Sequence, residues 1–176
     1  MSIAHIINPF SKPTTEAEAR MKARASAIAL FLSAALGAVG VILLQQNPEL
    51  LQSQIEAQVA AQGAGAPEGM GDLVTSMAIG GGWFMVIVQV LLGLIQWWKP
   101  NIVIPIIMLI LTAFGLLSAL GQWAMNPEQA RLAMELQPLW LMVANWIVMV
   151  LGVLLHLSSI LGVNQLNSLR RQGKAD

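Results

Sequence analysis

The sequence predicts an all-α integral membrane protein with four transmembrane helices. Only 10% of its 176 residues are charged and 56% are hydrophobic, whereas a soluble domain has about 25% charged residues. A helix needs about 20 apolar residues to cross a hydrocarbon core about 30 Å thick. Four uncharged stretches are long enough, at about residues 25–45, 74–98, 102–125 and 139–163.

These four stretches are expected to be helices and not barrel strands. Without water in the bilayer core, a spanning segment must satisfy its backbone groups as a helix or in a closed barrel. The stretches are continuous in Leu, Ile, Val, Met and Ala and lack the alternation of barrel strands.

The distribution of basic residues predicts the topology. Every Lys and Arg except Arg131 lies in the N-terminal tail (1–24), in the turn after Trp98, or in the C-terminal tail (164–176). Segments rich in Lys and Arg stay in the cytoplasm. We therefore expect both termini inside, most simply at a bacterial inner membrane. Tryptophans at the two headgroup levels are expected as anchors: Trp97 and Trp98 inside, Trp123 and Trp140 outside.

A repeated tripeptide indicates two tandem-duplicated hairpins, residues 25–98 and 99–163. Aligning residues 28–49 with 107–128 needs no gap, and aligning 82–101 with 145–164 pairs Trp83 with Trp146. Such self-similarity is typical of internal repeats, and parallel repeats are related by a two-fold axis along the membrane normal. The first alignment superposes two Asn-Pro-Glu tripeptides, formed by Asn47, Pro48 and Glu49 and by Asn126, Pro127 and Glu128.

Each tripeptide is also interpreted as the start of a short outer helix. Asn suits the N-cap, Pro the first helical position, and Glu the positive end of the dipole. We expect amphipathic outer helices at about residues 48–61 and 127–136. At the other side, Thr15 to Glu18 form a capping box, and the helix that it starts is expected to continue into the first span. The preceding "IAHIINPF" suits either an interfacial anchor or a docking peptide.

Polar and small residues form one stripe on the second span and one on the fourth. Offsets of 0, 7, 11 and 14 residues stay close to one line on a helix. We expect the stripes to face each other, with Gln89 opposite Gly152 and His156 opposite Gly93, so that Gln89 and His156 bond. This predicted polar seam is either structural or a polar path or ligand site, and it consists of Gln89, Gly93, Gln96, Asn145, Gly152, His156 and Ser159, with Gly82 at its end.

Signals for catalysis are nearly absent. No Asp, Glu, Lys or Arg lies within a span, there is no cysteine, and the two histidines are far apart in sequence. Intramembrane function usually employs ionisable residues, so no catalytic, metal or cofactor site is expected. Ligation of a pigment by His156 alone stays an alternative.

The sequence therefore favours a non-catalytic subunit, scaffold or assembly factor of a larger membrane complex. Its expected partners are the lipid bilayer and other membrane subunits or a second copy, with no nucleic acid. The alternative is a small transporter, channel or lipid-handling protein built from a parallel repeat.

Overall fold

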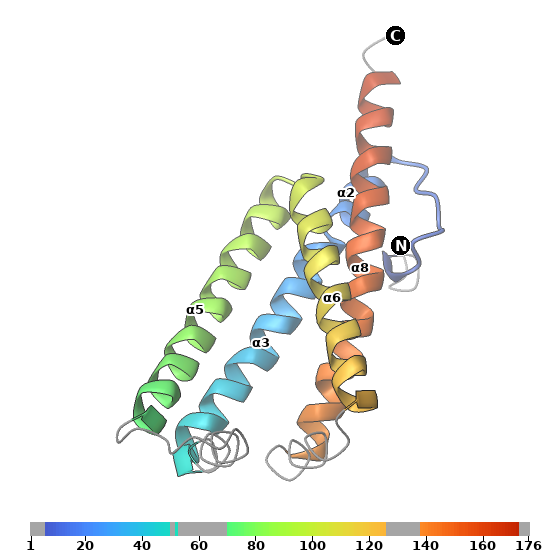
Figure 1. Ribbon diagram of the computed structural model, residues 1–176. Coiled ribbons are helices and arrows are strands. Elements are labelled where there is room, and N and C mark those ends of the chain that lie inside the picture. Colours follow the sequence, from blue (N-terminus) through green and yellow to red (C-terminus); the bar gives the residue numbers. More distant parts are fainter. Residues whose placement is uncertain (1–5, 50–51, 53–69, 126–137, 173–176) are drawn as a thin grey trace.

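The chain is all-helical wherever it is described. The structure, a computed structural model, describes residues 6–49, 52, 70–125 and 138–172, and these contain no strand. Figure 1 shows the helices, which are α2 (Glu16–Ala23), α3 (Ala25–Gln46), α5 (Met70–Trp98), α6 (Val103–Met125) and α8 (Leu139–Gln172). Within these described ranges, four helical segments are long and apolar enough to cross a membrane, as predicted. The chain is thus compatible with a multi-pass membrane protein.

Helix α8 continues to Gln172, well beyond the predicted end of the fourth span at residue 163. The extra turns are packed against the rest of the chain, because Leu166 is 2% exposed and α2 contacts α8. An apolar contact outside the predicted span therefore extends the helix.

The four long helices pack in the order α5, α3, α8, α6. Helix α3 contacts both α5 and α8, and α6 contacts α8. Helices α5 and α6 are consecutive but do not pack along their lengths. A two-fold axis that exchanged the hairpins would map the α3–α8 contact onto an α6–α5 contact of similar extent. The packing gives no support for that axis, so the duplication stays a prediction from the sequence.

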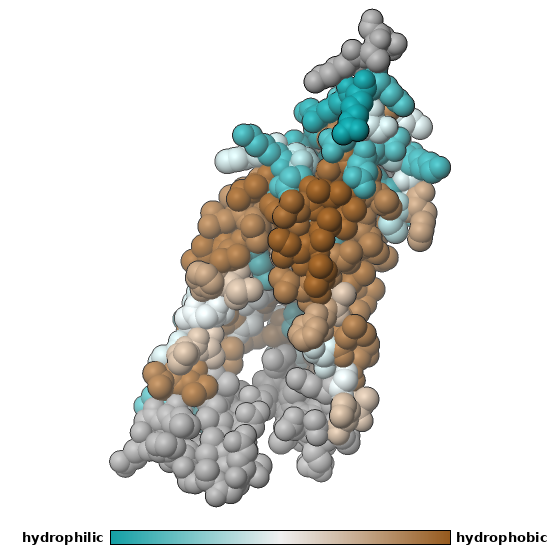
Figure 2. Space-filling view, turned by 45° about the horizontal axis from the view of Figure 1, so that its top comes forward, coloured by the Kyte–Doolittle hydropathy of each residue, from teal (hydrophilic) through white to brown (hydrophobic). Residues whose placement is uncertain are grey.

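Helices α5 and α6, at the two ends of this row, leave most of their apolar surface uncovered by the chain. In α5 and in α6, 6% of the most apolar 18-residue stretch is buried, compared with 39% in α8. Figure 2 shows a hydrophobic belt below a hydrophilic cap. We call the capped end, formed by α2, the α5–α6 turn and the last turns of α8, the basic end (top of Figure 1).

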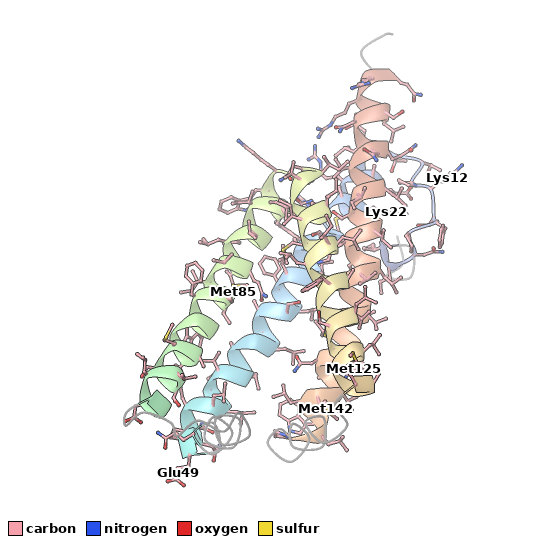
Figure 3. The ribbon with its side chains drawn as sticks, viewed as in Figure 1. Lys12, Lys22, Glu49, Met85, Met125 and Met142 are labelled. Carbon is pink, nitrogen blue, oxygen red and sulfur yellow. The ribbon has the colours of Figure 1, made fainter. Side chains whose placement is uncertain are left out.

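The opposite end holds the predicted caps of the outer helices. Asn47 donates from its side-chain amide to the carbonyl of Leu43 at 3.2 Å, so it caps the C-terminal end of α3. Pro48 and Glu49 are exposed there, and Figure 3 labels Glu49 at this end. Outside the described residues lie the cap residues Asn126, Pro127 and Glu128, the side chain of Trp123, the predicted helix 127–136, and nearly all of the predicted helix 48–61.

Candidate functional site: a hydrogen-bonded junction at the basic end

The helix that leads into the first span is interrupted at the basic end, at Arg24. Thr15 caps α2 by accepting from the Glu18 amide at 3.2 Å, but α2 stops at Ala23 and α3 begins at Ala25. The Ala27 amide donates to the carbonyl of Arg24 at 3.0 Å, not to that of Ala23, its usual partner four residues back. The predicted continuous helix is therefore wrong at Arg24, and the Ala23 carbonyl needs another donor.

Close packing of α8 accompanies this break. A Cβ added to Gly162 would lie 2.5 Å from the backbone nitrogen of Ala23 and 2.7 Å from the carbonyl carbon of Lys22. Only glycine allows the two backbones to approach this closely.

Two polar side chains replace the missing backbone hydrogen bond. Gln96 of α5 donates to the Ala23 carbonyl at 3.0 Å, and the Ser159 hydroxyl of α8 donates to it at 2.6 Å. Both side chains are fully buried. A buried carbonyl without a hydrogen-bond partner costs free energy, so these two bonds allow the helix to break inside the bundle.

Gln96 also holds the turn that leads into α6. Its amide donates to the Asn101 carbonyl at 3.1 Å and its oxygen accepts from the Asn101 nitrogen at 3.3 Å. Asn101 in turn caps α6 by accepting from the Ile104 amide at 3.0 Å. One glutamine thereby connects the break between α2 and α3 to α5 and to the start of α6. We call Ala23, Ser26, Gln96, Asn101, His156 and Ser159 the junction.

His156 joins α8 to α3 within the junction. Its Nδ1 shares a hydrogen bond of 2.7 Å with the Ser26 hydroxyl, and the two residues are 2% and 0% exposed. This distance would suit a nucleophile and its base, but a substrate could not reach the serine. A macrocycle likewise needs open space beside a ligating ring, and this ring is enclosed. The pair is best described as a structural contact.

The predicted pairing of Gln89 with His156 is wrong, because α3 lies between α5 and α8. A Cβ added to Gly93 would meet the Phe31 ring of α3 at 2.7 Å, and one on Gly152 would meet Thr112 of α6 at 3.4 Å. The glycines thus receive side chains from other helices than expected. Gln89 and Asn145 are half-buried.

Gln96 and Ser159 do meet, at 3.3 Å, at the basic end of the two stripes. Of the predicted tryptophan anchors, Trp97 is half-buried and Trp98 is 74% exposed at this end, while Trp140 is 56% exposed at the other.

The N-terminal segment docks on the chain itself. The buried Lys22 ammonium donates to the carbonyls of Asn8 at 3.1 Å and Pro9 at 3.0 Å, and to the carbonyl and the hydroxyl of Ser11. The Ser158 hydroxyl donates to the Ile6 carbonyl at 2.5 Å. Figure 3 shows Lys22 beside α8, and Lys12 farther out on the N-terminal segment.

Apolar contacts support this docking. Ile6 and Ile7 pack against a buried cluster of Ala25, Ala29 and Leu155. Of the two predicted roles for this segment, its described residues therefore act as a docking peptide, with the bundle of the same chain as receptor.

Sequence reasoning missed Lys22, which counted there only as a topology signal. A weak signal exists, since Lys22 shares one face of α2 with Ala19 and Ala23, which are 0% exposed. Small residues three and four positions apart on a helix indicate close packing, and a lysine within such a face is a candidate for burial.

No known protein family, curated protein sequence or solved structure matches this chain. Among the described residues, no group of three or more His, Cys, Asp or Glu is placed to hold a metal ion.

Proposed function

We propose that this chain is a non-catalytic multi-pass subunit or scaffold of a larger membrane complex, with its basic end in the cytoplasm. The observation that carries the proposal is that the polar groups inside the bundle are used to join helices. Gln96, Ser159 and His156 are all buried and all bond to protein atoms. In the described part of the chain, Thr75 Oγ1 is the single buried side-chain polar atom without a partner.

The uncovered helix faces supply the surface for partners. On α5, Phe84, Leu91 and Ile95 are at least half exposed, and on α6 so are Phe114 and Leu117. In a bilayer such faces meet lipid or other helices. Association between membrane helices depends on close packing. The exposed faces of α5 and α6 lie on either side of the hydrogen-bonded helices α3 and α8, which suits a subunit that contacts neighbours on two sides.

Site-specific photo-crosslinking in native membranes tests this proposal. A photoreactive phenylalanine derivative is introduced at Phe114 of α6, with Phe84 of α5 as the second site and Trp140, exposed near one end of α8, as a control of similar exposure. A discrete protein adduct of one mass from an α5 or α6 site, and none from Trp140, is expected. Lipid adducts alone at all three sites, with a monodisperse monomer in mild detergent, would contradict the subunit role.

Orientation is tested separately. The chain has no cysteine, so single cysteines at Glu49 and Gln172, both exposed and at opposite ends, report sidedness without background. An impermeant maleimide added to intact cells should label Glu49→Cys and spare Gln172→Cys. The reverse pattern would invert the topology.

A further inference from the structure

We propose that Arg24, held against Trp97 beside the exposed Trp98 and Lys99, binds the headgroup phosphate of an anionic phospholipid at the basic end. This inference requires membrane embedding but not the proposed subunit role.

Arg24 is anchored to the end of another helix. Its Nε donates to the Trp97 carbonyl at 2.8 Å, and its guanidinium carbon lies 5.0 Å from the centroid of the Trp97 ring. The last carbonyls of a helix have no partner within it and carry its negative dipole end, so a cation is favoured at this end of α5. The bond and the ring together hold the guanidinium in one orientation, which lowers the entropic cost of binding a ligand.

The anchored guanidinium keeps most of its donors. Arginine has five N–H groups, and the bond to the Trp97 carbonyl uses the one on Nε. Within the described residues, no acidic side chain pairs with Arg24, whereas Arg170 lies 4.0 Å from the carboxylate of Glu16. The two terminal nitrogens form a planar fork that matches two phosphate oxygens. A fixed fork without a carboxylate partner is suited to an external phosphate.

The position of the site identifies the source of that phosphate as lipid. Trp98 is 74% exposed where the apolar belt ends, and the exposed Lys99 follows it directly. Tryptophan prefers the headgroup level of a bilayer, so the Arg24 fork lies where phospholipid phosphates are. Basic residues near an anionic leaflet each favour binding by about 1 kcal/mol, which is about a fivefold change in affinity.

Native mass spectrometry of the full-length protein, released from detergent with added lipid, tests this site. Phosphatidylglycerol and phosphatidylcholine are compared on the parent chain, Arg24→Gln and Lys12→Gln. The Lys12 variant removes the same charge from an exposed residue of the same end. We expect the parent to retain phosphatidylglycerol preferentially, Arg24→Gln to retain it about fivefold less, and Lys12→Gln to match the parent. Equal losses in both variants, or no headgroup preference in the parent, would overturn the site.

Two further arms keep the result decisive. If Arg24→Gln does not yield a folded protein, Arg24→Lys replaces it, because it keeps the charge and loses the fork. If Arg24→Lys retained as much phosphatidylglycerol as the parent, the proposal would be overturned. Inorganic phosphate at millimolar concentration is added as competitor, and displacement of the lipid by it would show that the site takes a soluble phosphate instead.

Discussion

The basic end and the opposite half of the bundle hold their helices together by different means. At the basic end, directed hydrogen bonds from Gln96, Ser159 and His156 cross between helices. Farther along, side chains fill glycine notches, as where Val41 of α3 faces Gly82 of α5. Removing one partner of a buried hydrogen bond leaves the other partner unsatisfied at its full desolvation cost. Neighbouring side chains can shift to absorb part of a change in packing volume. The junction is therefore expected to be the less tolerant of the two regions.

The largest effect is expected at Gln96. Replacing it with Leu leaves the Asn101 carbonyl and nitrogen and part of the bonding of the Ala23 carbonyl unsatisfied. At about 1–3 kcal/mol for each buried unpaired group, the free energy of unfolding should fall by roughly 3 kcal/mol. Thermal denaturation in detergent measures this. Gln89→Leu, the same change on the same helix at a half-buried site, is the control and should cost less than about 0.5 kcal/mol. Equal losses in the two variants would show that the junction has no special weight.

The next effect is expected at Lys22. In Lys22→Met the carbonyls of Asn8, Pro9 and Ser11 lose their shared donor, so the N-terminal segment should detach and the fold should lose about 2 kcal/mol. A nitroxide attached to Phe10→Cys, at a position 87% exposed, reports the detachment as a gain in mobility. Arg20→Met, on the exposed side of the same helix, should leave the spectrum unchanged. An immobile label in the Lys22 variant would contradict docking through this lysine.

A smaller effect is expected in the glycine notches. A methyl group at Gly82 would lie 2.5 Å from Cγ2 of Val41, whereas one at Gly80 meets nothing within 4 Å. Gly82→Ala should therefore destabilise the protein by about 1–2 kcal/mol, and Gly80→Ala should be neutral or slightly stabilising because alanine favours helix. Adding Val41→Ala to Gly82→Ala should recover part of the loss in the same denaturation assay. Absence of recovery would mean that α3 and α5 are not in contact there.

The smallest effect is the coupling between Ser26 and His156. A double-mutant cycle of Ser26→Ala and His156→Leu, measured by thermal denaturation, should give a coupling free energy of about 0.6 kcal/mol. This is the mean for polar side-chain pairs between membrane helices. A coupling near zero would remove this bond from the junction.

How far the sequence determines this fold differs between its parts. The four spans follow from length and apolarity, because the bilayer imposes both requirements on each segment separately. The break at Arg24 does not, since "RMKARASAI" consists mainly of good helix formers and contains no Gly or Pro. It coincides with the approach of Gly162 from a distant helix, which no local pattern specifies.

The candidate site was partly predictable for a similar reason. Helical periodicity places Gln96 and Ser159 in two stripes, and these two residues do meet. Periodicity does not reveal that α3 lies between α5 and α8. It therefore predicts Gln89 as the partner of His156, whereas His156 bonds to Ser26. The face of a helix is encoded locally, whereas its neighbour depends on the packing of the whole chain.

The N-terminal docking has a consequence for how the chain is made. The Ile6 carbonyl accepts a hydrogen bond from Ser158, which lies 152 residues later in the sequence. The Ala23 carbonyl accepts one from Ser159, which lies 136 residues later. Because synthesis proceeds from the N-terminus, Ile6 and Ala23 can complete these bonds only after α8 has been made. A chain that lacks α8 therefore lacks both donors, and Lys22 of α2 then holds the N-terminal segment without the bond from Ser158.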